Sequence, residues 1–142
     1  MIRPFRKDDL SVVMQIWLEA NIKAHNFISK DYWTDNYAMV KDLLPQAEIY
    51  VYEDDDTNQI DGFIGLSDNY IEGIFVRETL RSRGVGKQLL NYVKKIKSIM
   101  RLSVYQKNTR AIEFYQREQF VICSENIDDS TNKKEFIMAW SK

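Results

Sequence analysis

Cysteine and histidine are almost absent from this sequence, since each occurs once among 142 residues. The single cysteine, Cys123, excludes an internal disulfide, and so few cysteine and histidine ligands argue against a structural zinc site. No stretch approaches the roughly 20 apolar residues of a membrane-spanning helix. The N-terminus, Met1 to Lys7, lacks the apolar core of a secretory signal. We therefore expect a cytoplasmic protein that binds no metal and does not enter a membrane.

The chain also lacks linkers, repeats and low-complexity tracts. Its 142 residues, 44% of them hydrophobic, suit one compact domain spanning residues 1–142. The formal net charge is −1, yet seven basic residues and one acid, Glu78, occur between positions 77 and 97. This basic patch is small and contains no aromatic-rich binding motif, so nucleic acid is not expected as a partner.

A glycine-rich segment at residues 81–87, Arg-Ser-Arg-Gly-Val-Gly-Lys, lies within the basic patch. The apolar run from Ile71 to Val76 predicts a buried strand before it, and apolar residues at helical spacing predict a helix over 87–98. Unpaired N–H groups at a helix N-terminus attract anions, and glycine leaves room for a ligand to approach them. The segment therefore predicts a phosphate site, with a solvated helix face after a glycine turn as the plainer alternative.

Two well-known phosphate motifs do not fit this segment. A Walker loop would need glycine at position 81 and serine or threonine at position 88, where the sequence has Arg81 and Gln88. A dinucleotide fingerprint would need a third glycine at position 89, which is Leu89. The phosphate site must therefore be of another kind.

Periodicity and turn residues predict a chain that mixes strands and helices. An edge strand at 2–5 and an amphipathic helix from Asp8 come first, and residues 22–44 predict two further short helices, ended by Pro45. Another helix is expected over 108–118. The strands at 71–76 and 102–105 should be parallel, because a helix connects them. The other strands are expected at 49–52, 60–66, 120–123 and 136–140.

Two motifs in this arrangement resemble those of the GNAT superfamily of acetyl-CoA-dependent N-acetyltransferases. Residues 81–86, Arg-x-x-Gly-x-Gly, are similar to its acyl-CoA segment, and residues 108–115 are similar to its Asn-x-x-Ala-x-x-Phe-Tyr motif. The element order β-α-α-β-β-β-α-β-α-β-β also resembles that of the family. It implies an α/β (α+β) fold with a mixed central sheet of about seven strands flanked by helices. One departure is Gln119, which replaces a glycine that usually ends the helix in a left-handed conformation.

The resemblance implies an enzyme that moves an acetyl group from acetyl-CoA to a primary amine by direct transfer in a ternary complex. The acceptor would be a small-molecule amine or the amine of a peptide or protein, and the enzyme would be a monomer or homodimer. A catalytically silent CoA-binding or regulatory module on the same fold is the alternative. The resemblance implies a cofactor-binding set made of Ile74, Phe75, Val76, Arg81, Ser82, Arg83, Gly84, Val85, Gly86, Lys87, Asn108, Ala111 and Phe114.

Five further residues are candidates for chemistry. The resemblance implies that Tyr115 protonates the departing thiolate, since a phenol of pKa about 10 stays protonated at neutral pH; periodicity alone favours a core residue. Glu72 is the leading base for the acceptor, because an acid in a largely apolar strand is usually paired or functional; an exposed strand-end carboxylate is the alternative. His25 and the neighbouring Phe27 are candidates for substrate binding, with His25 otherwise a proton relay or a structural histidine. Cys123 lies in an expected core strand, which favours inert packing over an acetyl-cysteine intermediate.

Overall fold

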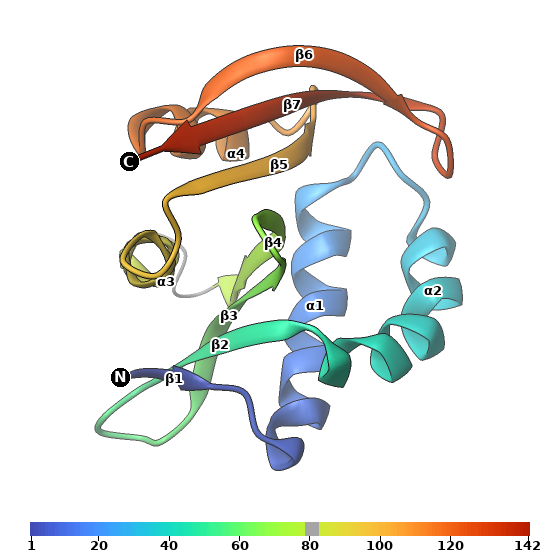
Figure 1. Cartoon of the computed structure of the whole chain (residues 1–142). Coiled ribbons are helices and arrows are strands. Elements are labelled where there is room, and N and C mark those ends of the chain that lie inside the picture. The colour runs from blue at the N-terminus through green and yellow to red at the C-terminus, as the bar shows by residue number, and fades with distance from the viewer. Residues whose placement is uncertain (79–82) are drawn as a thin grey trace.

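The computed structural model describes residues 1–78 and 83–142. Within these residues, seven strands form one mixed sheet in the spatial order β1-β2-β3-β4-β5-β7-β6 (Figure 1). The strands are β1 (Ile2–Pro4), β2 (Glu48–Glu53), β3 (Ile60–Ser67), β4 (Tyr70–Val76), β5 (Ile99–Tyr105), β6 (Val121–Asp128) and β7 (Lys133–Ser141). The helices are α1 (Leu10–Ala24), α2 (Lys30–Leu43), α3 (Val85–Lys94) and α4 (Thr109–Arg117), with short 3-10 turns η1 (Lys7–Asp9) and η2 (Leu44–Gln46). This order confirms the predicted α/β fold.

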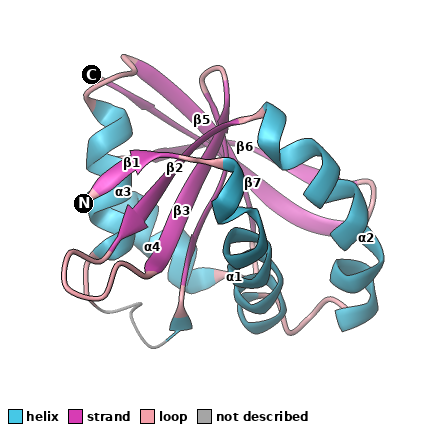
Figure 2. Cartoon of the chain, turned by 90° about the horizontal axis from the view of Figure 1, so that it is seen from below, coloured by secondary structure: helices cyan, strands magenta, loops and turns pink. Residues whose placement is uncertain are grey.

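Helices cover both faces of the sheet (Figure 2). On one face, α1 and α2 bury Val13, Ile16 and Trp33 against β2 and β3. On the other face, α3 and α4 bury Leu89 and Ile112 against the middle of the sheet. Each such apolar side chain stabilises the fold by about 1.5–3 kcal/mol when fully buried. The two cores therefore hold the sheet between them and fix the positions of the helix ends.

β4 and β5 are parallel neighbours, as predicted, but they pair over two positions only. Tyr70 pairs with Arg101 and Ile71 with Leu102. Beyond these pairs the strands diverge, so residues 72–76 of β4 have no partner on β5. Main-chain groups along this edge of β4 are therefore available to a ligand.

The pairing of β4 with its other neighbour, β3, slips by one residue at Glu72. Gly73 pairs with Gly65 and Ile71 pairs with Leu66, so Glu72 has no partner on β3. An extra residue of this kind bends the strand and re-aims its side chain, and such bulges are frequent beside active sites. The slip and the end of the β5 pairing occur at the same point of β4.

Two helix predictions were wrong in their boundaries. Residues 22–44 do not form two separate short helices. Residues 22–24 are the end of α1, and α2 is the one helix that lies within the rest of this range. The chain then starts α2 after Ser29, whose Oγ accepts a hydrogen bond from the Asp31 N–H. The helix predicted over 87–98 runs from Val85 to Lys94, since the apolar stripe begins at Val85, which is buried.

The strand predicted at 120–123 also differs from expectation. It is part of β6, which lies at the edge of the sheet with β7 as its only strand neighbour among the described residues. Val121, Ile122 and Cys123 are consequently exposed, so Cys123 is not a core residue. Gln119 just before β6 has a φ of 74°, which is the left-handed conformation expected where the family has glycine.

A buried ionic network fastens the N-terminus to the sheet. Arg3 of β1 donates hydrogen bonds of 2.8 and 3.0 Å to the two carboxylate oxygens of Asp9, and one of 2.9 Å to Glu53. The bonds from Arg3, and then one from the Arg6 N–H, hold the pKa of Asp9 below its ordinary value despite burial. In the part of the chain that the structure describes, no helix has the length and apolar character needed to cross a membrane.

Candidate active site

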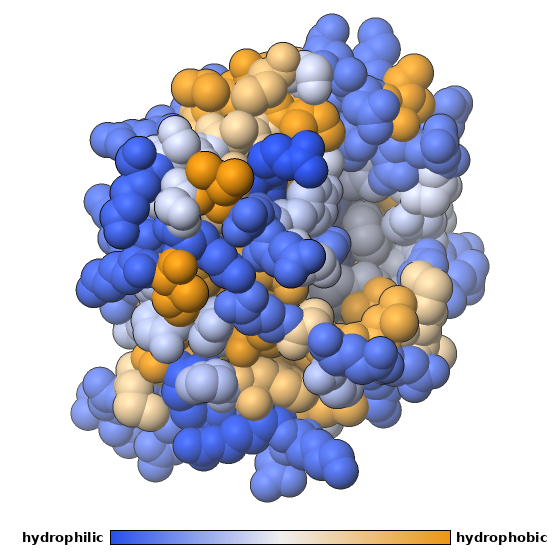
Figure 3. Space-filling view, viewed as in Figure 1, coloured by the Kyte–Doolittle hydropathy of each residue, from blue (hydrophilic) through white to orange (hydrophobic). Residues whose placement is uncertain are grey.

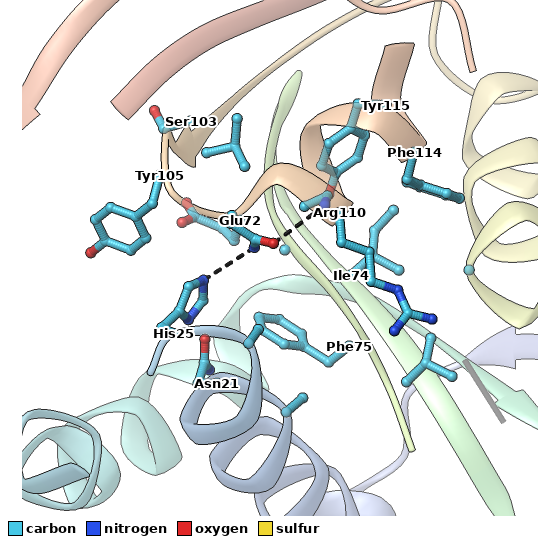
Figure 4. Close-up of a pocket in the computed structure, with 18 of the residues that line it drawn as sticks. Asn21, His25, Glu72, Ile74, Phe75, Ser103, Tyr105, Arg110, Phe114 and Tyr115 are labelled. Carbon is cyan, nitrogen blue, oxygen red and sulfur yellow. Dashed lines mark hydrogen bonds between the residues drawn. The ribbon is translucent and has the colours of Figure 1, made fainter. Parts of the chain in front are cut away.

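A cavity of about 1120 Å³ opens where β4 and β5 diverge. Its wall is formed by residues of α1, α2, β4, α3, β5, α4, β6 and β7. The close-up in Figure 4 shows these elements converging on one space from different parts of the chain. Most of the site residues predicted from the sequence that the structure describes lie in this wall.

The N-terminus of α3 forms one end of the cavity. Gly84 precedes the helix with a φ of 78°, a left-handed conformation that glycine adopts without strain. A Cβ atom placed on Gly84 would meet no described atom within 4 Å, so the space before the helix N-terminus is open. Gly84, Gly86 and Lys87, which were predicted to bind the cofactor, all line the cavity. Unpaired N–H groups and open space at a helix start suit an anionic ligand.

Other residues of the glycine-rich segment are placed differently. Val85 is 3% exposed and packs in the core, so it supports the helix rather than lining the cavity. Arg83 is exposed and is not among the described lining residues. Arg81 and Ser82, also predicted to bind the cofactor, lie outside the described residues.

Two basic lining residues, Arg110 and Arg117 of α4, were missed from the sequence. They are seven positions apart, which places them on one face of a helix. Phe114, between them at helical spacing, was predicted and also lines the cavity. The spacing of Arg110, Phe114 and Arg117 was therefore the signal that could have identified both arginines.

The middle of the cavity is lined by β4. Ile74, Phe75 and Val76, which were predicted to bind the cofactor, lie in its wall together with Gly73. A Cβ atom on Gly73 would lie 2.3 Å from the ring of Phe75, so a larger residue at this position would require that ring to move. The strand thus offers main-chain groups at the point where it has left β5.

α4 brings the second sequence motif to the same cavity. Asn108 caps the helix, because its Oδ1 accepts a hydrogen bond of 3.3 Å from the Ala111 N–H. Its Nδ2 lies 3.4 Å from Nε2 of His25 (Figure 4). Tyr115 lines the cavity yet is only 7% exposed. Burial raises the pKa of Tyr115 above the ordinary value of 10.0, so its hydroxyl remains protonated at neutral pH.

His25 and Glu72 lie in the wall away from α3 (Figure 4). The His25 ring stacks on Trp33 and meets Tyr105 edge-on, with centroids 5.2 Å apart in both cases. Glu72 is exposed to the cavity. Phe27 is not among the described lining residues, because it packs against His25 and Tyr105 at 5.7 and 5.6 Å. It supports the wall without forming its surface.

Several polar side chains near His25 were missed from the sequence. Tyr70 donates a hydrogen bond of 2.8 Å to Ser103 across the last paired positions of β4 and β5. Asp128 and Glu135 add two carboxylates to that of Glu72 in the cavity wall. Asp128 belongs to β6 and Glu135 to β7. These strands lie near the end of β5 because β7 pairs with both β5 and β6. No local pattern signals such a meeting.

Comparison with known proteins gives the arrangement a family context. Residues 45–122 match the family model described as an acetyltransferase (GNAT) domain. Over 142 residues the chain is 34% identical to peptidyl-lysine N-acetyltransferase YiaC of Escherichia coli K12, with 99% of this chain and 96% of that protein covered.

Solved structures give the same result for the fold. The solution structure of apo YjaB from Escherichia coli matches with a TM-score of 0.86 and 25% identity, covering 98% of this chain and 95% of that one. PaiA N-acetyltransferase of Thermoplasma acidophilum, solved with coenzyme A, matches with a TM-score of 0.85 at 20% identity, covering 100% and 98%. The second likeness concerns the fold alone.

Proposed function

Because this chain belongs to the GNAT family of acetyltransferases and is an N-acetyltransferase, we propose that it transfers acetyl groups from acetyl-CoA to lysine side chains of peptides or proteins. YiaC is named as a peptidyl-lysine N-acetyltransferase, and so is YjaB, which is 25% identical to this chain. The carboxylates of Glu72, Asp128 and Glu135 in the cavity wall support a cationic acceptor. An arriving lysine carries a positive charge at neutral pH, since its pKa is about 10.4.

The residues at the α3 end fit the phosphates of CoA. The open space before Gly84 and the helix N-terminus would receive the pyrophosphate, and Lys87 would add positive charge. Arg110 and Arg117 add two further basic side chains to the cavity. The unpaired edge of β4 at residues 72–76 would hold the pantetheine arm through main-chain groups, with Asn108 facing it. When bound, acetyl-CoA supplies an acetyl group activated as a thioester.

Tyr115 is proposed as the general acid. Its hydroxyl is buried in the cavity wall and its pKa is raised, so it holds a proton at every pH at which the enzyme is expected to work. A thiolate with a pKa of about 8.5 gains from a hydrogen bond as it forms. The role of Tyr115 is to donate that hydrogen bond and then the proton.

Glu72 is proposed as the base that removes the proton from the lysine ammonium, with His25 as the alternative. Glu72 lies at the bulge of β4, exposed to the cavity and next to the main-chain edge that would face the thioester. His25 lies in the same wall, but its contacts with Asn108 and Trp33 also suit a purely positioning role. Either group would deliver a neutral amine, which is the form that attacks.

Direct transfer in a ternary complex is supported by the place of the only cysteine. Cys123 lies exposed in β6 and is not among the described residues of the cavity wall. An acetyl-cysteine intermediate would require a thiol beside the thioester. The protein is proposed to act without a metal, and its cytoplasmic location and its state as monomer or homodimer stay predictions.

The observation that carries the proposal is one cavity between diverging strands, with a helix N-terminus at α3 and four carboxylates in its wall. Glu118 lies 4.0 Å from Lys87, and Glu72, Asp128 and Glu135 are the carboxylates proposed to meet the acceptor. The test is release of free CoA from acetyl-CoA with N-terminally blocked peptides that contain one lysine. A peptide with arginine in place of lysine is the matched control, because it carries the same charge without an acylable amine. Release with lysine alone supports the proposal. CoA binding without release for any amine would instead identify a silent CoA-binding module.

A further inference from the structure

One hydrogen bond between side chains links β4 and β5 at the point where the two strands diverge. The hydroxyl of Tyr70 on β4 donates to Oγ of Ser103 on β5 at 2.8 Å. Tyr70 is one of the two paired residues of β4, whereas Ser103 directly follows Leu102, the last residue of β5 that pairs with β4. Tyr70, Ser103 and Glu72 all line the cavity. These three side chains are here called the apex.

Glu72 and Ser103 occupy equivalent positions on the two strands of the apex. The last residues to pair are Ile71 and Leu102. The next residue is Glu72 on β4 and Ser103 on β5, so these are the first two to be separated by the divergence. Figure 4 shows Ser103 on the side of Glu72 that lies away from Arg110, and Figure 3 shows the surface hollowed near α1 and α2. The apex therefore presents a carboxylate from one strand and a hydroxyl from the other to the same cavity.

The surroundings of Tyr70 keep its hydroxyl protonated. Burial raises the pKa of Tyr70 above its ordinary value of 10.0, the hydrogen bond with Ser103 opposes this rise, and the charges of Glu72 and Glu135 add to it. Tyr70 in turn contributes to the raised pKa of Tyr115. Influences of this kind weaken with distance. The Tyr70 hydroxyl therefore belongs to the part of the cavity that holds the proposed base and the proposed acid.

The hydroxyl of Ser103 has bonding capacity that Tyr70 does not use. A serine oxygen has two lone pairs, and the bond from Tyr70 occupies one of them. That bond fixes the position of the Ser103 oxygen and leaves the second lone pair for another N–H or O–H donor. An amine that attacks a thioester has to aim its own lone pair at the carbonyl carbon. A hydrogen bond from one of its N–H groups to a fixed oxygen sets that direction.

We propose that Ser103 accepts an N–H of the acceptor amine opposite Glu72, and that Tyr70 is a positioning residue that holds Ser103 for this task. This inference rests on the proposed function and adds to it how the amine is oriented. One proton of the ammonium passes to Glu72, and the lone pair so freed bonds to the acetyl carbon as the C–S bond breaks. A second proton leaves the nitrogen and replaces the one that Tyr115 gives to the thiolate. The third N–H, held by Ser103, stays on the amide product.

The test measures kcat/KM for a peptide with a blocked N-terminus and a single lysine, at saturating acetyl-CoA. Ser103→Ala should lower this value about fivefold or more, because one hydrogen bond of ordinary net strength is worth that factor. The loss should be the same across a pH series, because Ser103 takes no proton. Ser103→Thr keeps a hydroxyl on a residue type that suits strands and should recover most of the loss. Calorimetry should give an unchanged affinity for CoA in each variant.

Tyr70→Phe separates the hydrogen bond to the amine from the link between the strands. It removes the link but leaves the Ser103 oxygen in place, so the loss should be smaller than in Ser103→Ala. The double variant Tyr70→Phe/Ser103→Ala should lose no more than Ser103→Ala alone, because Tyr70 acts through Ser103. The matched control is Tyr50→Phe. Tyr50 is a half-buried strand residue whose hydroxyl donates to Glu48 at 2.6 Å, and it is not among the described lining residues, so this variant should keep the wild-type rate.

Two results would overturn the role of Ser103. One is a wild-type rate in folded Ser103→Ala. The other is an equal loss in Tyr70→Phe and Ser103→Ala together with weaker CoA binding, which would show that the bond only holds the two strands together. A wild type that acetylates a small primary amine but no lysine peptide would overturn the lysine assignment alone, and the same variants measured with that amine would then decide the role of Ser103. A wild type that acetylates no amine would overturn both.

Discussion

Nδ2 of Asn108 lies 3.4 Å from Nε2 of His25, so the cap of α4 meets the end of α1 across the cavity. Asn108 faces the space assigned to the pantetheine arm, and His25 belongs to the aromatic wall assigned to the acceptor. With the assignments proposed above, the two substrates would meet beside this contact. A change at His25 has to be examined for effects on the binding of both.

The first prediction separates the two candidate bases. Glu72→Gln keeps the shape of the side chain and should reduce kcat most at low pH, where fewer acceptor amines have lost their proton to solvent. Affinity for CoA should stay near that of the wild type. Rates across a pH series for Glu72→Gln and His25→Ala provide the measurement. If Glu72→Gln has no effect and His25→Ala is slow, the base is His25 or water.

Tyr115→Phe should reduce kcat by about 100-fold or more, the usual scale of a general-acid contribution. The ring and its packing remain, so thermal stability and CoA affinity should change little. The reduction should be smaller with a donor whose thiol is more acidic, because that thiolate needs less protonation to leave. Since burial raises the pKa of Tyr115 above 10.0, activity should show no loss from its ionisation below about pH 10. Wild-type turnover, with chemistry rate-limiting, would exclude Tyr115 as the acid.

Gly84→Val should weaken CoA binding by much more than Gly84→Ala. Both substitutions place a side chain on a residue with φ of 78°, at a cost of roughly 1–2 kcal/mol in strain. The alanine variant therefore controls for the strain that a Cβ atom alone brings, and comparison of the two melting temperatures measures the further strain of β-branched valine. Only valine extends further into the open space assigned to the pyrophosphate. Calorimetry of folded variants provides the measurement, and equal affinities for CoA would place the phosphates elsewhere.

The Arg3–Asp9 pair should make the stability of the fold depend on pH in the acidic range. The pKa of Asp9 is lower in the folded chain than its ordinary value of 3.8, so the pair stabilises the fold above that pH. This stabilisation is lost as the pH falls from 3.8 through the folded pKa. Asp9→Asn should cost about 3–5 kcal/mol at neutral pH, because it leaves a buried arginine short of a partner. The variant should also lose less stability on acidification than the wild type.

Asp55→Asn is the matched control for Asp9. The Asp55 side chain is 81% exposed and pairs with the N-terminal amine, and surface changes of this kind usually stay within about 0.5 kcal/mol. Urea unfolding between pH 3 and pH 7 compares the two variants with the wild type. Equal free energies of unfolding for Asp9→Asn and Asp55→Asn would show that the buried network stabilises the fold no more than a surface ion pair does.

Local patterns predicted the elements that carry the chemistry. Gly84 and Gly86 belong to one short segment at the start of α3, and Asn108 to Tyr115 form another. Residues of both segments line the cavity. The parallel pairing of β4 and β5 followed from the helix between them. These features are encoded within short stretches of chain. Periodicity and turn chemistry predicted the elements, and the resemblance to the GNAT superfamily singled out the Asn108 to Tyr115 motif.

The features that escaped prediction depend on contacts between distant segments. The bulge at Glu72 arises from the register with β3, and nothing in the sequence around Glu72 announces it. Asp128 reaches the cavity only because β7 pairs with both β5 and β6. Phe27 was predicted in the substrate site because it is close to His25 in sequence. Its ring packs against His25 and is not among the described lining residues of the cavity. Cys123 looked buried because its neighbours are apolar, whereas β6 has a strand on one side only.

The short pairing of β4 with β5 has a consequence for the protein without substrate. Among the described residues, 72–76 of β4 pair with a strand on one side only, so they form a sheet edge within the molecule. Unpaired edges are places where stray strands add and aggregation begins. Occupation of the cavity by CoA would cover this edge and at the same time connect the two halves of the sheet. Bound CoA would then stabilise the folded enzyme against aggregation as well as take part in its reaction.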